Sequence, residues 1–144
     1  KEQIENLNQK AGMYHVDIMD GHYCKNITLS PDMVKAFKQI STLPIDVHLM
    51  TTCPNDWIEQ VAQAGADIIS VHAETIGGDA FRTLNRIEEL GCGKGLVLNP
   101  ATPLETAKHY LDRIDILTIM TVDVGFSGQP FIIEMLEKIK EAKK

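Results

Sequence analysis

Residues 14–21 read YHVDIMDG, and this stretch decides how the fold is interpreted. Side chains alternate across a β-strand, so His15, Asp17 and Met19 share one face, and the valine and isoleucine between them share the other. A carboxylate on a covered face is costly unless it is paired or binds a metal ion. The stretch therefore predicts a strand with one apolar face and one chemically active face.

The same pattern returns in residues 45–50, which read IDVHLM. Here Asp46, His48 and Met50 share one face. An isolated histidine in such a place is most often a core residue that is satisfied by hydrogen bonds. Two strands with the same three residue types, each with its methionine nearest the C-terminal end, instead favour a shared site.

Two imidazoles and a carboxylate on neighbouring strands can form a three-ligand site for one divalent ion, either Zn²⁺, Mn²⁺, Fe²⁺ or Co²⁺. The two imidazoles are those of His15 and His48, and the strands offer the carboxylates of Asp17 and Asp46. Methionine is polarizable and would form an apolar wall over a bound molecule, although plain core packing is the alternative for each one. The methionines concerned are Met19, Met50 and Met120.

Outward from these strands, the chain alternates between apolar runs of strand length and helical patterns. Strands are expected at 13–19, 45–50, 67–72, 95–99 and 116–122. Helices are expected at 1–12, 30–40, 52–65, 78–91, 103–111 and 131–144. This alternation predicts parallel strands joined by crossover helices.

The spacing of the strands favours a barrel over an open sheet. One strand and helix take roughly 25 residues, so eight units need about 200, the lower end of the (β/α)₈ range. A doubly wound open sheet is the alternative, but no glycine-rich turn follows the first strand. We therefore expect residues 1–144 to form a single, incomplete (β/α)₈ TIM-barrel domain with five of its strands.

Composition limits the partners. The net charge of −6 argues against a nucleic-acid or anionic-membrane surface, and no apolar run of about 18 residues predicts a membrane span. Cys24, Cys53 and Cys92 are odd in number and form no C-x-x-C pair, which favours free thiols and a cytoplasmic location.

The segment after the last strand, residues 121–130, reads TVDVGFSGQP. Gly125 and Gly128 bracket Phe126 and Ser127, so successive N–H groups can turn around an anion. Most G-x-x-G patterns are simple turns. This one follows a strand and precedes a helix, which is typical of a phosphate site in a barrel.

The residue types also limit the chemistry. No lysine stands at an inward C-terminal strand position, which disfavours a Schiff-base aldolase, and no G-x-S-x-G elbow is present. A carboxylate beside a divalent ion suits proton abstraction next to a carbonyl group. Asp17 is the candidate catalytic base.

Three segments, HVDIMDG at 15–21, DVHLM at 46–50 and VDVGFSGQ at 122–129, together resemble the ribulose-phosphate 3-epimerase family. The resemblance implies a (β/α)₈ barrel of the ribulose-phosphate-binding type, with about its second to sixth strands in this chain. Three further segments are similar to the branch that acts on D-allulose 6-phosphate: 26–31, 72–76 and 129–132.

The resemblance also implies roles for individual residues. His15, Asp17 and His48 would bind one divalent ion, Asp17 would also act as acid/base, and His48 would also contact the substrate. The remaining substrate-binding residues would be Met19, Met50, Met120, Gly125, Phe126, Ser127 and Gly128. The substrate would be a ketose phosphate, of the D-allulose 6-phosphate or D-ribulose 5-phosphate type, in a homo-oligomeric metal-dependent isomerase.

In this family, epimerisation at C3 passes through a cis-enediolate, and two aspartates on opposite faces exchange the proton. No residue here matches the second aspartate, and the family's first and last two strands are not matched, so we expect the 144-residue chain alone to be inactive. Two alternatives stay open. A related sugar-phosphate decarboxylase or synthase is disfavoured because residues 17–20 read DIMD and lack the lysine of D-x-K-x-x-D. A truncated, non-catalytic chain could self-associate through open sheet edges.

The other three histidines have different expected places. His72 ends a predicted strand, where it would either support the metal ligands or only form a hydrogen bond. His22 and His109 are expected in a loop and on a helix surface.

Overall fold

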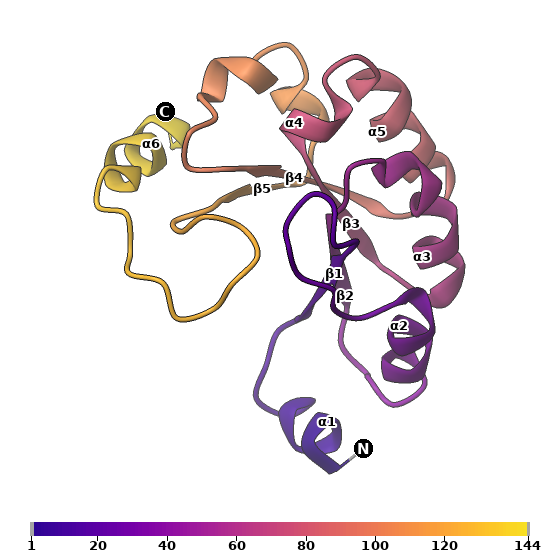
Figure 1. Cartoon of the computed structure of the whole chain (residues 1–144). Helices are drawn as coiled ribbons and strands as arrows, with labels where there is room; N and C mark the ends of the chain where they lie inside the picture. Colours follow the sequence, from indigo (N-terminus) through magenta and orange to yellow (C-terminus); the bar gives the residue numbers. More distant parts are fainter. Residues whose placement is uncertain (1, 144) are drawn as a thin grey trace.

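Five parallel strands in sequential order form the single sheet of the computed structural model, which describes residues 2–143 (Figure 1). The strands are β1 (Tyr14–Met19), β2 (Ile45–Met50), β3 (Ile68–His72), β4 (Gly93–Leu98) and β5 (Ile116–Ile119). A doubly wound sheet reverses its strand order at a switch point. The order β1-β2-β3-β4-β5 contains no reversal, so the alternative of an open doubly wound sheet is wrong.

Helices follow the strands around one side of the sheet, and α2, α3 and α5 lie beside one another there (Figure 1). The α-helices are α1 (Glu2–Leu7), α2 (Pro31–Lys38), α3 (Ile58–Ala64), α4 (Ala73–Ile76), α5 (Ala80–Glu89) and α6 (Met135–Ala142). Short 3₁₀ turns complete the set: η1 (Pro54–Asp56), η2 (Leu104–Ala107) and η3 (Leu111–Arg113). Within residues 2–143, none of these helices has the length and apolar character needed to cross a membrane.

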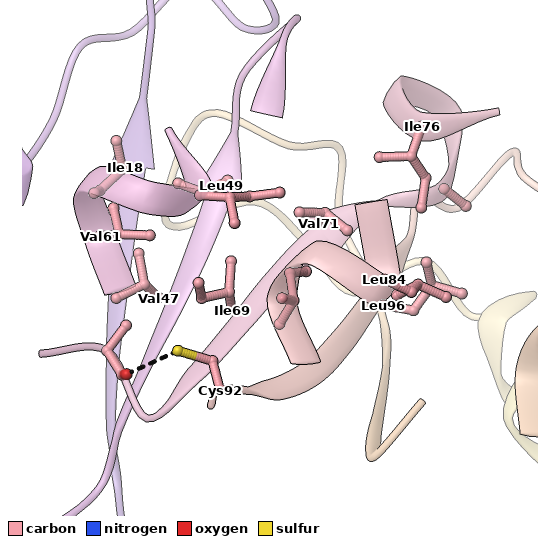
Figure 2. Packing of buried hydrophobic residues seen from close by; sticks show 14 of the residues in the cluster. Ile18, Val47, Leu49, Val61, Ile69, Val71, Ile76, Leu84, Cys92 and Leu96 are labelled. Carbon is pink, nitrogen blue, oxygen red and sulfur yellow. Dashed lines mark hydrogen bonds between the residues drawn. The ribbon is translucent and has the colours of Figure 1, made fainter. Parts of the chain in front are cut away.

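The helices pack against the apolar face of the strands (Figure 2). Ile18, Leu49 and Val71 come from three successive strands and contact the helix layer, where Val61 and Leu84 are also almost completely buried. Burial of each such side chain contributes about 1.5–3 kcal/mol. The predicted alternation along β1 is therefore confirmed on its apolar side.

The strand register places the predicted polar residues side by side. Across the β1–β2 pair, Asp17 lies opposite His48 and Met19 lies opposite Met50. His15 lies opposite Asp46. Because adjacent residues in a parallel pair point to the same side, all six side chains project from the face that the helices do not cover.

The predicted helix over 103–111 is wrong, because the segment forms the 3₁₀ turn η2 and ends where η3 begins. Its buried residues are Leu104, Ala107 and Tyr110, which recur at every third position. A 3₁₀ helix has three residues per turn, so this spacing places all three on one side of a 3₁₀ segment.

Other boundaries also differ from the sequence prediction. Strand β5 ends at Ile119 rather than at residue 122, because Met120 donates the last ladder bond to Leu98 and β4 ends there before Pro100. Residues 73–76 form α4, which was not predicted. The last helix starts at Met135 rather than at residue 131. The outermost residues of the two predicted terminal helices, positions 1 and 144, lie outside the described residues.

Candidate functional site

Three potential metal ligands meet at the uncovered face of β1 and β2. Oδ1 of Asp17 lies 3.0 Å from Nδ1 of His48 and 3.3 Å from Nε2 of His15. The three ligand atoms all lie within 4.8 Å of one another. The structure thus brings together the three residues that the sequence analysis selected.

A buried carboxylate orients the first of these imidazoles. Oδ2 of Asp46 lies 2.7 Å from Nδ1 of His15, and Oδ1 of Asp46 accepts a 2.7 Å hydrogen bond from the hydroxyl of Ser70. A carboxylate can only accept, so His15 carries a proton at Nδ1. In the neutral imidazole, Nε2 then keeps its lone pair on the side of Asp17, as in metal sites where a carboxylate orients a histidine ligand.

The electrostatics of the cluster favour an ionised Asp17. Hydrogen bonds from His15 and His48 hold the pKa of Asp17 well below its usual range, despite partial burial. Conversely, hydrogen bonds to Asp17 and Asp46 raise the pKa of His15 to about 10 and outweigh its burial. Asp17 is therefore ionised and faces two imidazole nitrogens, an arrangement in which a cation can replace their protons on binding.

His72 lies directly behind the cluster. Its Nε2 is 2.8 Å from Nε2 of His48, and the two rings stack with their centroids 4.9 Å apart. The ring of Tyr23 packs nearby, 4.8 Å from that of His72. Burial lowers the pKa of His72. By contrast, His22 and His109 are exposed in a loop and a turn, away from this cluster.

A cavity of about 380 Å³ opens over the cluster. Of the predicted site residues, those that line it are His15, Asp17, Met19, His48, Met50, Met120, Gly125, Phe126 and Ser127. Gly128 is exposed in the same loop and does not contribute to the lining. The remaining lining residues are Asn26, Thr28, Val122 and Asp123. The segment that follows β5 thus shares a cavity with the strand residues.

Sequence reasoning missed the side chains that join the two loops around this cavity. Nδ2 of Asn26 donates a 3.0 Å hydrogen bond to the carbonyl of Gly125, and the hydroxyl of Thr28 donates a 2.7 Å bond to the carbonyl of Asp17. Both residues follow the C-terminal end of a strand, where barrel sites are built. That position was the signal that could have identified them.

The glycine loop has the backbone that its sequence requires. Gly125 has a φ of 116° and Gly128 a φ of 78°, conformations that other residues adopt only under strain. A Cβ added at Gly125 would lie 2.9 Å from Cβ of Cys24. The side chain of Gln129 closes the loop by donating to the carbonyls of Asp123 and Phe126, at 2.7 Å and 2.9 Å.

The fold is that of a TIM-type barrel. The structure is similar to a mutant tryptophan synthase alpha-subunit from the hyperthermophile Pyrococcus furiosus, with a TM-score of 0.61 over 98% of this chain and 68% of that one. Only 20% of the aligned residues are identical, so this likeness concerns the fold alone.

Curated relatives are much more similar in sequence. The chain is 47% identical over 134 residues to a ribulose-phosphate 3-epimerase of Bacillus subtilis, covering 93% of this chain and 61% of the relative. It is 45% identical to the chloroplastic ribulose-5-phosphate-3-epimerase of Arabidopsis thaliana, covering 90% and 47%. It is 42% identical to a ribulose-phosphate 3-epimerase of Escherichia coli strain K12, covering 93% and 60%.

The chain thus spans about half to three-fifths of the length of these three relatives. The model of the ribulose-phosphate 3 epimerase family matches residues 1–144, with the cluster of His15, Asp17 and His48 inside the match. The chain belongs to the ribulose-phosphate 3-epimerase family.

Proposed function

We propose that this chain carries the metal-binding part of the active site of a ketose-phosphate 3-epimerase, an isomerase that inverts C3 of its substrate. The observation that supports this most directly is the convergence of His15, Asp17 and His48 under a cavity shared with the glycine loop. Ribulose-phosphate 3-epimerases among the curated relatives support the same reaction class.

The three converging residues would hold one divalent ion, either Zn²⁺, Mn²⁺, Co²⁺ or Fe²⁺. The donor set fits, because the pKa of Asp17 lies well below its usual range, and Nε2 of His15 and Nδ1 of His48 both face its carboxylate, where an ion would take the place of their protons. When bound, the ion would polarise the substrate carbonyl and so acidify the adjacent C–H group.

Asp17 would exchange the proton at C3 through its carboxylate. Its low proton affinity in this structure comes from the hydrogen bonds of His15 and His48. Inversion needs a second acid on the opposite face of the substrate, and no residue of this chain matches the family's second aspartate. We therefore propose that residues 1–144 are a single, incomplete barrel domain that is inactive by itself.

The rest of the cavity would hold the sugar phosphate. The methionines on three strand ends would limit water around the reacting carbons, and His48 would contact the substrate. Backbone N–H groups of residues 125–128 would receive the phosphate, with the Ser127 hydroxyl as an additional donor. The substrate would be D-ribulose 5-phosphate or D-allulose 6-phosphate. The ribulose-phosphate 3-epimerases among the relatives favour the former, and the segments 26–31, 72–76 and 129–132 favour the latter.

The alternative of a decarboxylase or synthase gains no support from the cavity, because no lysine of residues 2–143 contributes to its lining. A non-catalytic chain remains an outcome of the test. Homo-oligomerisation and a cytoplasmic location stay predictions, which light scattering and cell fractionation would check.

The test is deuterium exchange at C3 in D₂O, followed by proton NMR on both candidate substrates. The sample is the full gene product that contains this chain, before and after metal removal with a chelator. We expect exchange and inversion with one substrate, loss on chelation and recovery with a divalent ion. Full activity without any metal would contradict the proposal, and no turnover of either substrate would favour the non-catalytic alternative.

A further inference from the structure

A continuous row of polar atoms runs from the metal-ligand cluster into the interior through His48 and His72. Both residues are almost completely buried, with 2% and 0% of their surface exposed. Their Nε2 atoms are 2.8 Å apart, so one of the two must donate and the other accept. Nδ1 of His72 is buried without a hydrogen bond of good geometry. Nothing proposed above uses this atom.

Which nitrogen of His48 carries the proton decides whether this residue can bind a cation in the cluster. Nδ1 of His48 faces Asp17 and can bind a cation only when it carries no proton. A neutral His48 must then carry its proton on Nε2 and donate it to His72. His72 accepts at Nε2 and, being neutral, must carry its own proton at Nδ1.

Glu74 is the acceptor available for that last proton. Its Oε2 lies 3.3 Å from Nδ1 of His72. Its other oxygen, Oε1, is held by the backbone N–H of Asn99 at 3.0 Å and by the hydroxyl of Thr102. Although partial burial alone would raise the pKa of Glu74, the neighbouring His72 ring and hydrogen bonds from Thr102 and backbone N–H groups hold it at about 2.

The surroundings also fix the orientation of the His72 ring. Tyr23 packs against it, and the hydroxyl of Tyr23 accepts a 2.6 Å hydrogen bond from the side chain of Asn99. The hydroxyl of Thr75 donates a 2.9 Å bond to the carbonyl of His72. The ring therefore has little freedom to exchange the positions of its two nitrogens.

From this row we infer that Glu74, acting through His72, is a positioning residue that holds His48 in the tautomer whose Nδ1 is free to bind a cation. The inference rests on the metal site proposed above and adds two residues, Glu74 and His72, that do not touch the ion. A carboxylate stands behind each imidazole of the cluster: Asp46 directly behind His15, and Glu74 one ring further behind His48.

The substitution Glu74→Gln tests this role, because glutamine has nearly the same shape as glutamate but replaces one carboxylate oxygen by an NH₂ donor. The amide carbonyl would have to remain where Asn99 and Thr102 donate, which turns the NH₂ group toward Nδ1 of His72. Two donors would then face each other whenever His48 binds the ion. If the amide is flipped, its NH₂ group faces the backbone N–H of Asn99 instead, and again two donors meet. Either arrangement penalises metal binding.

The experiment measures the Zn²⁺ dissociation constant of the full gene product by competition with a chromophoric chelator. We expect Glu74→Gln to weaken binding by about 10–100-fold, the usual effect of losing a partner behind a metal ligand. Glu88→Gln, which alters a surface glutamate paired with Lys94, is the matched control and should leave the constant unchanged. Thr102→Val, which removes one donor from Glu74, should give a smaller loss.

Proton-detected ¹⁵N spectra of the Zn²⁺-loaded wild-type protein provide a second readout that does not depend on any variant folding. They should show His72 protonated at Nδ1 and His48 protonated at Nε2. Protonation of His72 at Nε2, or an unchanged Zn²⁺ constant in a folded Glu74→Gln protein, would overturn the inference. Absence of Zn²⁺ binding to the wild type would instead refute the proposed metal site itself.

Discussion

Two histidines on the strands that flank β2 show how strongly the local partners decide the chemistry of a residue. His15 contacts the carboxylates of Asp17 and Asp46, and its pKa rises to about 10. His72 is buried against another imidazole, and its pKa falls. The residue type is the same, but a nearby negative charge favours the charged ring and burial disfavours it.

At this scale, Asp17→Asn is the most direct change to the proposed reaction. It removes both a metal ligand and the proposed acid/base, and positioned acid/base groups contribute about 10²–10⁴-fold to a rate. We expect C3 deuterium exchange in the full gene product to fall by at least about 10²-fold. Asp112→Asn, in an exposed 3₁₀ turn, is the control and should retain the wild-type rate. Wild-type exchange in Asp17→Asn would remove Asp17 from the mechanism.

Asp20 gives a prediction about pH. Its Oδ1 accepts from the N–H groups of His22 and Tyr23, and its Oδ2 accepts from the N–H and hydroxyl of Thr52. These hydrogen bonds outweigh its partial desolvation and lower its pKa from 3.8 to about 2. A depressed pKa stabilises the folded state above the unfolded value, and this stabilisation is lost as the pH falls toward about 2.

We therefore expect Asp20→Asn to lower the free energy of unfolding by about 1 kcal/mol near neutral pH. The difference from the wild type should shrink between pH 3.8 and about pH 2, where the wild-type carboxylate becomes protonated. Urea unfolding at several pH values measures it. A difference that stays constant down to about pH 2 would show that Asp20 does not act through its charge.

At the scale of the elements, the close approach of β3 and β4 supports the cluster. Gly95 lies opposite Ser70 in the ladder, and a Cβ added at Gly95 would lie only 1.9 Å from Oγ of Ser70 and 2.8 Å from its Cα. That hydroxyl is the donor to Asp46, which orients His15. A glycine on β4 therefore leaves space for the hydrogen bonds behind a ligand on β1, three strands away.

Gly95→Ala should both destabilise the sheet and disturb the cluster. Overpacking against backbone costs about 1–3 kcal/mol, which chemical unfolding would detect. Zn²⁺ affinity should fall as well, because Ser70 must move. Gly77→Ala is the matched control, since an added Cβ there meets nothing within 4 Å and should change stability by less than about 0.5 kcal/mol. Unchanged stability in Gly95→Ala would mean that the two strands separate at little cost.

At the scale of the whole molecule, the site joins parts that are far apart in the chain. Asn26 and Gly125 are 99 positions apart and share a hydrogen bond, and Met120 lines the same cavity as Met19. The two ligand-bearing strands are also paired along their full length. An ion held by both strands would therefore stabilise the folded sheet as a unit.

Added Zn²⁺ should accordingly raise the melting temperature of the full gene product. At about 100 times the dissociation constant, binding to the folded state alone contributes about 2.7 kcal/mol. His48→Ala should lose most of this increase, whereas His109→Ala, which changes an exposed residue outside the cluster, should keep it. Each protein is compared with itself with and without the ion. An equal increase in His48→Ala would place the bound ion elsewhere.

Much of this arrangement could be predicted from the sequence because strand geometry is local. Alternation alone places His15, Asp17, Asp46 and His48 on one face and the aliphatic residues on the other. The order of strands and helices was likewise sufficient to favour a barrel. The predicted helix over 103–111 was wrong because helical propensity does not show which residues tertiary packing will bury. Here every third residue is buried, which suits a 3₁₀ turn.

The sequence by itself determined the strands, the polar face and the imidazoles and carboxylates on it, because these depend on residue type and a period of two. Only the tertiary structure decided which nitrogen of each imidazole faces Asp17, and that Asp46 and Glu74 lie behind the two rings. It also decided that Asn26 binds the glycine loop. The physical reason is that a hydrogen bond depends on separations of about 3 Å, which are set by register and packing between distant segments.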